Sequence, residues 1–186
     1  MLKTCITGSV YYLRYRTHLG QSVFASSALC IQMIEAMKFY TYSDSTRFSR
    51  NIYVRDAVFQ DKRSTLLAFC ILPNEYHILL QQNADHGIYQ TIKRTHESIT
   101  RYYNSLFKRT GRVFDSKKAR MEYIYPEFRD FTTKQIEELP MYAFQGNWKS
   151  YPWSSYHERQ RSFLKLPIQI DLVSKISSFP SHHAKE

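Results

Sequence analysis

Two apolar runs separated by a Pro-Asn pair, in the segment LLAFCILPNEYHILL over residues 66–80, constrain the fold more than any other feature of the sequence. Apolar runs on either side of a turn signal predict two strands, over about residues 65–71 and 76–81, joined by a tight turn. Glu75 and His77 stand two residues apart, so their side chains are expected on one face of the second strand. A carboxylate and an imidazole that converge in this way can bind a divalent metal, or they can form an ordinary solvated pair at a sheet edge.

The rest of the chain alternates between strand and helix patterns. Residues 8–16 are rich in tyrosine and valine and are predicted to form a strand. Apolar residues at helical spacing predict helices over about 26–39 and 88–106, and a further helix over about 127–139 that Pro140 ends. This order indicates the α+β class, with an antiparallel sheet and helices packed on one face.

Length and composition predict an ordinary globular protein. The 186 residues suit one domain over about 1–165, with an insertion at about 43–62 and a C-terminal tail over 166–186. No run of eighteen apolar residues is present, so no membrane span is expected. The cysteines are odd in number, far apart and set among apolar residues: Cys5, Cys30 and Cys70. This usage is typical of buried thiols in a reducing compartment, and we predict a cytoplasmic location.

The charge balance favours a polyanionic partner. The chain has 26 Lys and Arg against 16 Asp and Glu, a formal net charge of +10. Nine of these cations fall between residues 91 and 120: Lys93, Arg94, Arg101, Lys108, Arg109, Arg112, Lys117, Lys118 and Arg120. Aromatic residues are interleaved with them: Tyr102, Tyr103, Phe107 and Phe114. The pattern predicts a surface that follows a nucleic-acid backbone, although a solvated helix face has the same composition.

Three segments, in this order, resemble the REP-associated tyrosine transposases, a group of single-tyrosine HUH transposases. AFCILPNEYHILL is similar to the strand–Met-Pro-Asn-His-x-His–strand segment of that family. ITRYYNSLFKRTGRVF is similar to its helix and basic turn, and YPWSSYHE to its Tyr-Pro-Trp-Ser-Ser-Tyr segment. The resemblance implies a ferredoxin-like fold and a homodimer that acts on folded single-stranded DNA. It also implies two histidines that hold a divalent ion and a tyrosine that becomes covalently joined to the DNA.

The chain departs from this family at the residues that cut DNA. Glu75 replaces the first histidine of the pair, so Glu75 and His77 form either a modified Mg²⁺ or Mn²⁺ site or a site that holds nothing. The segment QIEELP resembles the catalytic Tyr-Ile-x-x-Asn-Pro pattern, which places Gln135 at the position of the nucleophile. Tyr142, seven residues later, is a weak substitute, and Tyr123 and Tyr125 are further candidates.

These features predict a DNA-binding protein, derived from a tyrosine transposase, that binds hairpin or single-stranded DNA and is impaired in catalysis. We expect Arg14 and Arg16 to contact phosphates together with the nine cations given above. Two alternatives remain open. One is an active metal-dependent DNA-nicking transposase with an unusual Glu/His site, and the other is a binder of RNA or protein that uses the same basic surface.

Overall fold

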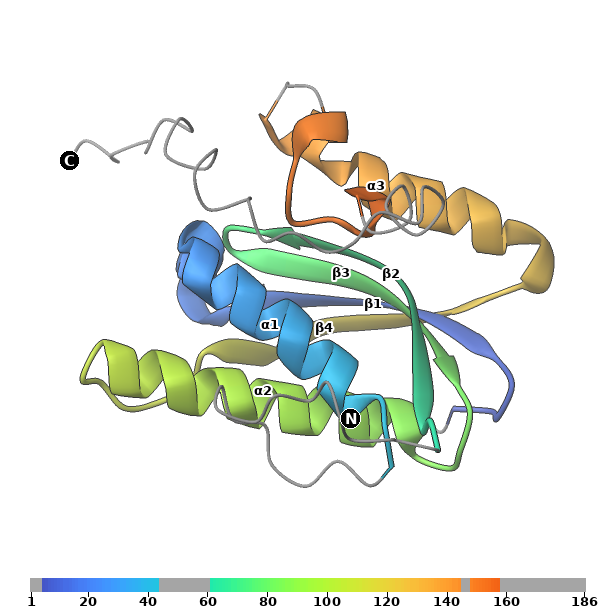
Figure 1. Ribbon diagram of the computed structural model, residues 1–186, viewed down its shortest axis with the longest axis horizontal. Helices are drawn as coiled ribbons and strands as arrows, with labels where there is room; N and C mark the ends of the chain where they lie inside the picture. The colour runs from blue at the N-terminus through green and yellow to red at the C-terminus, as the bar shows by residue number, and fades with distance from the viewer. Residues whose placement is uncertain (1–4, 44–60, 145–147, 158–186) are drawn as a thin grey trace, which may run out of the picture.

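The computed structural model of the protein describes residues 5–43, 61–144 and 148–157. Within these residues, four strands and three α-helices follow one another in the order β1 (Val10–Thr17), α1 (Ser27–Tyr40), β2 (Ser64–Leu72), β3 (Glu75–Gln82), α2 (Gly87–Leu106), β4 (Phe114–Ile124) and α3 (Arg129–Phe144). The strands form one sheet in the order β2-β3-β1-β4, with every neighbouring pair antiparallel. The first six of these elements have the βαββαβ order of a ferredoxin-like fold, so the predicted α+β class is confirmed (Figure 1).

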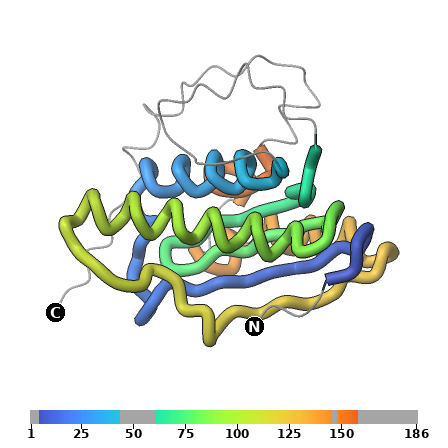
Figure 2. Tube along the Cα trace, turned by 90° about the horizontal axis from the view of Figure 1, so that it is seen from below, coloured from blue at the N-terminus to red at the C-terminus, as the bar shows by residue number. Residues whose placement is uncertain are grey.

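The helices cover both faces of the sheet. Helices α1 and α2 lie side by side on one face, above the main hydrophobic core, as the prediction of helices on one face requires (Figure 2). Helix α3, which was predicted on the same face as the other helices, instead packs on the opposite face, where Ile136 joins a second cluster that contains Cys70 and Leu79. This second cluster covers mainly β2, because α3 makes most of its sheet contacts with that strand.

Two expectations for the second half of the chain were wrong or incomplete. Strand β4 was not predicted, because charged residues interrupt its apolar positions and Phe114 alone is buried along it. Helix α3 does not end before Pro140 but continues to Phe144 with Pro140 inside it. Pro140 removes the hydrogen bond that an N–H at this position would donate to Ile136, while its own side chain is buried.

Several predicted features fall wholly or partly outside the described residues. Of the insertion expected at 43–62, residues 44–60 lie outside them, and its flanks Tyr42 and Lys62 pair as an antiparallel bridge. The predicted tail over 166–186 also lies outside them. Among the helices in the described part of the chain, none is long and apolar enough to cross a membrane. Cys30 and Cys70 are buried free thiols, as predicted, and Cys5 is half-buried.

Candidate nucleic-acid interface

Glu75 and His77 lie on the sheet face that α3 covers in part. Leu79, the next residue on this face of β3, packs in the same cluster as Ile136 of α3. Strand β1 runs antiparallel to β3 and pairs Arg14 with His77 and Arg16 with Glu75. The side chains of β1 that face in this direction therefore meet those of Glu75 and His77, whereas α1 and α2 lie behind the sheet.

One oxygen of the Glu75 carboxylate accepts hydrogen bonds from two arginines. Oε2 of Glu75 is 2.7 Å from Nη2 and 3.2 Å from Nε of Arg14, and 2.9 Å from Nε of Arg16. Burial alone raises the pKa of Glu75, but the hydrogen bonds from Arg14, His77 and Arg16 outweigh burial and lower the pKa to about 2. Glu75 is therefore ionised at neutral pH and neutralises part of the charge of the two arginines.

His77 is held between Glu75 and a tyrosine. Its Nε2 lies 3.0 Å from Oε1 of Glu75, and its Nδ1 lies 2.6 Å from the hydroxyl of Tyr12. An ionised carboxylate only accepts hydrogen bonds, so Nε2 carries the proton and Nδ1 accepts the bond from the Tyr12 hydroxyl. Burial lowers the pKa of His77, although the hydrogen bond to Glu75 acts in the opposite direction. Burial also raises the pKa of Tyr12 to about 12, which keeps its hydroxyl protonated.

This arrangement does not fit a divalent ion between Glu75 and His77. Both ring nitrogens of His77 and both carboxylate oxygens of Glu75 already have partners, and two guanidinium groups lie within 3.2 Å of Oε2. A divalent cation would have to displace these positive charges and would find only two protein ligands. Within the described residues, no three His, Cys, Asp or Glu side chains are gathered so that they could hold a metal.

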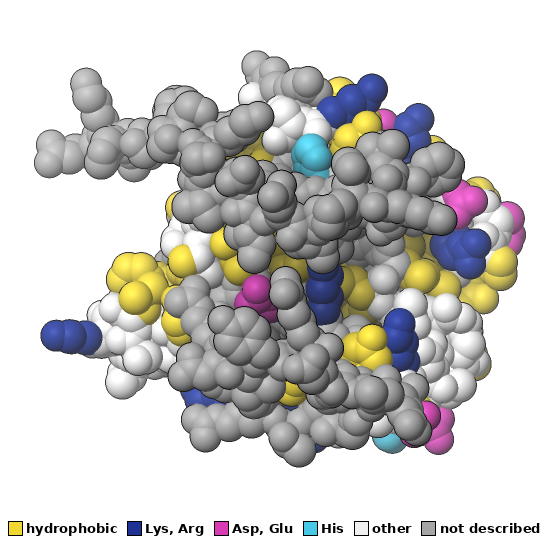
Figure 3. All heavy atoms as spheres, in the orientation of Figure 1, with side chains coloured by type: hydrophobic (Ala, Val, Ile, Leu, Met, Phe, Trp, Pro, Cys, Tyr) yellow, Lys and Arg dark blue, Asp and Glu magenta, His cyan; other side chains and the backbone are white. Residues whose placement is uncertain are grey.

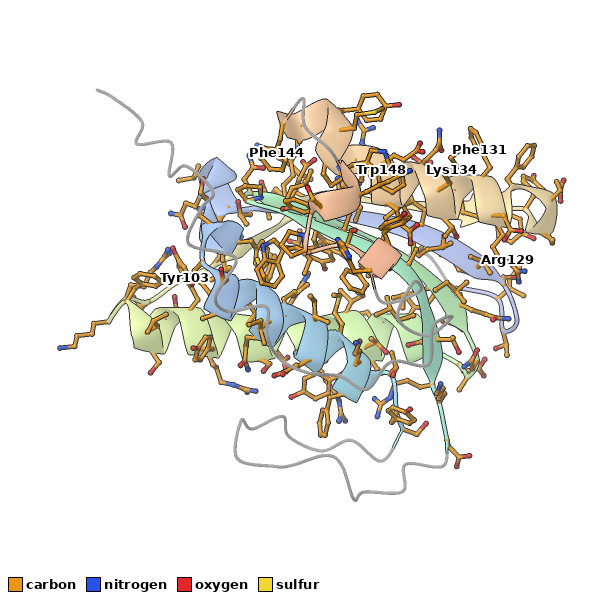
Figure 4. The ribbon with its side chains drawn as sticks, turned by 45° about the horizontal axis from the view of Figure 1, so that its top comes forward. Tyr103, Arg129, Phe131, Lys134, Phe144 and Trp148 are labelled. Carbon is orange, nitrogen blue, oxygen red and sulfur yellow. The ribbon has the colours of Figure 1, made fainter. Side chains whose placement is uncertain are left out.

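The position expected for a nucleophile carries an exposed amide. The side of α3 that faces the sheet carries the buried residues Thr133, Ile136, Glu137 and Pro140, whereas Gln135 is exposed. Tyr142, the weak substitute, is 72% exposed in the last turn of the same helix. Figure 4 shows Phe131 and Lys134 on the outer surface of α3, pointing away from the sheet.

Other tyrosines show where sequence reasoning was limited. Tyr123 and Tyr125 are exposed and meet edge to face, with ring centroids 4.9 Å apart. The tyrosine that does contact His77 is Tyr12, which the sequence did not single out. The contact between Tyr12 and His77 could not be predicted, because the register between β1 and β3 cannot be read from either strand alone.

The segment that resembles Tyr-Pro-Trp-Ser-Ser-Tyr closes the outer edge of β2. The Ile71 N–H donates to the carbonyl of Trp153 at 2.8 Å, and Ser154 forms an antiparallel bridge with Cys70. The hydroxyl of Ser155 is buried. It donates to Oε1 of the buried Glu137 at 2.7 Å and accepts the Phe69 N–H at 3.1 Å. This serine therefore joins α3, β2 and the segment.

Most of the predicted cations gather at one end of the sheet. There the end of β1 meets the β2–β3 turn, because the Thr17 N–H donates to the Asn74 carbonyl at 2.9 Å. It also meets the α2–β4 loop, because the His18 N–H donates to the Val113 carbonyl at 2.8 Å. We call this end of the molecule, with both faces of the sheet, the basic end and define it by Arg14, Arg16, Arg101, Lys108, Arg109, Arg112, Lys117, Lys118 and Arg120. Figure 3 shows a cationic side chain projecting from the molecule at the end where α2 stops.

Specific contacts hold the α2–β4 loop in the basic end. Nη1 of Arg109 donates to Oε1 of Gln21 at 2.8 Å, and its guanidinium lies over the Tyr103 ring, 5.2 Å from the centroid. On β4, Arg120 pairs with Arg14 across the sheet. The register then shifts, so that Lys117 and Lys118 stand on an irregular stretch of the strand.

Two of the predicted cations lie elsewhere. Lys93 and Arg94 stand near the middle of α2, roughly 20 Å along the helix axis from its last residue, Leu106. The structure therefore does not bring them to the basic end. The run of charge between residues 91 and 120 is divided because a helix, a loop and a strand carry different parts of it.

An open groove of about 400 Å³ lies between α2 and the start of β4, with Arg101 and Arg112 among its lining residues. His96, which was not identified from the sequence, is among the lining residues. The His96 ring stacks on Phe114 with centroids 3.9 Å apart, and its Nε2 lies 2.5 Å from the Tyr76 hydroxyl. Burial lowers the pKa of His96 to about 3, so its ring stays uncharged at neutral pH and the arginines give the groove its positive charge.

Comparison with known proteins supports the fold. No protein-family model matches the chain, and no curated protein matches it. Among solved structures it is similar to that of a REP-associated tyrosine transposase bound to a REP hairpin, with a TM-score of 0.58 and 11% sequence identity. The match covers 90% of this chain and 87% of that chain. At this identity the likeness establishes a shared fold and a distant structural relation.

Proposed function

We propose that this protein binds DNA, as a hairpin or as a single strand, through the basic end. The gathering of nine cations at one end of the sheet is the observation that carries the proposal, because a phosphate backbone binds where such charges converge. The net charge of +10 supports it. So does the similarity in fold to a transposase that was solved with a REP hairpin.

We also propose that the protein binds DNA without cutting it. Gln135 stands where the resemblance expects a nucleophilic tyrosine, and an amide does not attack a phosphodiester as a tyrosine hydroxyl does. The Glu75 and His77 side chains are engaged by two arginines and a tyrosine instead of being open to a divalent ion. The alternative of a metal-dependent nicking enzyme would require both features to rearrange.

Fluorescence anisotropy with a labelled DNA hairpin that carries single-stranded flanks tests the binding proposal. If about six cations contact phosphates, the logarithm of the binding constant falls with the logarithm of salt concentration with a slope of about −5. Arg101→Ala combined with Arg112→Ala is expected to weaken binding by about tenfold or more and to reduce the slope by about 2. Lys38→Ala combined with Lys134→Ala removes the same charge outside the basic end and is the matched control.

The outcomes separate the proposed function from its alternatives. No binding at about 50 mM salt would remove DNA as the partner. Tighter binding of an RNA hairpin of the same sequence would support the alternative that the surface binds RNA. The cysteine usage leads us to propose a cytoplasmic location, and the resemblance leads us to propose a homodimer. Light scattering on the purified protein tests the homodimer by its molecular mass.

A further inference from the structure

The basic end includes a negatively charged side chain, the carboxylate of Glu75. Within the sheet face, Arg14, Arg16 and Arg120 carry three positive charges, and Glu75 is the carboxylate that two of them bind directly. Oε2 of Glu75 accepts three N–H groups from Arg14 and Arg16, which are donors that a phosphate oxygen also accepts. The Glu75 side chain is 14% exposed and that of Arg16 is 49% exposed, so a ligand can reach this pair from the open side.

We propose that Arg14 and Arg16 form a metal-independent site for one phosphate of the nucleic-acid backbone, which Glu75 occupies in the free protein. This inference rests on the proposed DNA binding and specifies how one phosphate is held. On binding, a phosphate oxygen takes the place of Oε2 as the acceptor of the arginine N–H groups. Glu75 keeps its bond to His77 through Oε1, so the carboxylate can turn away from the arginines without losing every partner.

The geometry favours this role over a purely structural ion pair. Oε1 of Glu75 is bound to His77, so Arg14 and Arg16 share the single remaining oxygen, Oε2. These bonds use two donors of Arg14 and one of Arg16, and each guanidinium carries five N–H groups. Glu75 therefore leaves most donors of this pair for a second anion. The same guanidinium charges oppose a divalent ion, so the site does not depend on one.

The test is the affinity of Glu75→Gln for the labelled hairpin DNA. The amide side chain preserves the size of the carboxylate and can still accept a hydrogen bond, but it removes the charge that competes with phosphate. We expect binding about five- to tenfold tighter than in the wild type, and a salt slope steeper by about 0.7 to 0.9. EDTA is expected to leave the affinities of the wild type and of Glu75→Gln for the hairpin unchanged. Glu35→Gln is the matched control, because Glu35 is exposed on α1, behind the sheet, and its removal changes the net charge equally.

Two results would overturn the inference while leaving the proposed function intact: weaker or unchanged binding by Glu75→Gln, or loss of wild-type binding on chelation of divalent ions. Wild-type protein that does not bind the hairpin at all would contradict the proposed function itself. If Glu75→Gln does not fold, the Nε–H resonances of Arg14 and Arg16 in wild-type protein decide the question. Titration with hairpin DNA in EDTA is expected to shift both signals, and unchanged signals would contradict the inference.

Discussion

Replacement of Ser155 by alanine is expected to destabilise the fold more than any other single hydroxyl deletion in the YPWSSYHE segment. Its hydroxyl donates to Glu137, which is 3% exposed, and accepts the N–H of Phe69, which is 2% exposed. Without the hydroxyl, a buried carboxylate oxygen and a buried backbone N–H each lose a partner. An unsatisfied buried group costs about 1–3 kcal/mol, so we expect a loss of about 3 kcal/mol in the free energy of unfolding.

A neighbouring residue provides the control for this prediction. Ser154 is also buried, but within the described part of the chain its hydroxyl has no hydrogen-bond partner. Ser154→Ala should therefore change the free energy of unfolding by less than about 0.5 kcal/mol or increase it. Urea unfolding followed by circular dichroism measures the free energy of unfolding of both variants. In thermal unfolding, the melting temperature of Ser155→Ala should fall by roughly 6–12 °C. Equal effects of the two substitutions would refute the reasoning.

Two further predictions concern His96 and the start of α2. Burial lowers the pKa of His96 to about 3, so protonation of the unfolded chain should destabilise the protein by about 2 kcal/mol as the pH falls from 6.5 to 5. Urea unfolding at several pH values should show a flatter dependence for His96→Gln, and an unchanged slope would contradict this. A Cβ on Gly87 would lie 1.9 Å from the Arg63 carbonyl oxygen, so Gly87→Ala should cost about 1–3 kcal/mol of unfolding free energy. Gly8→Ala is the comparison: it meets no atom within 4 Å at a φ of +86°, so in thermal unfolding it should cost only about 1 kcal/mol, and an equal loss in both variants would argue against the close contact.

The hairpin and its two polar residues were predictable because they depend on local pattern. Two apolar runs around a Pro-Asn break define β2 and β3, and alternation along a strand places Glu75 and His77 on one face. The same kind of pattern defines α1 and α2. These elements are continuous in sequence, so no knowledge of distant contacts was needed to find them.

The network around Glu75 was not predictable because it depends on contacts between distant strands. Tyr12 and Arg14 reach His77 and Glu75 only through the register of β1 against β3, which separates the partners by more than sixty positions in several pairs. The sequence identified Arg14 as a cation for phosphate, but its bond to Glu75 changes what the Glu75–His77 pair can do. In the assembled sheet, the candidate metal pair Glu75 and His77 is therefore part of a site that also contains Arg14 and Arg16.

Strand β4 and the placement of α3 were missed for a different reason. Charged residues occupy most exposed positions of β4, so its sequence lacks the apolar run that indicates a strand. Pro140 is usually a stop signal, yet it is buried inside α3, and packing against the sheet outweighs the lost backbone bond. In both cases tertiary contacts decide the structure.

The most direct test of the central claim is incubation of the purified protein with end-labelled hairpin DNA bearing single-stranded flanks, with Mn²⁺ or with EDTA, on native and denaturing gels. We expect a native shift of equal size under both conditions and no covalent band on the denaturing gel, because the arginines need no metal and Gln135 cannot attack the phosphate. A covalent protein–DNA band that depends on Mn²⁺ would contradict it.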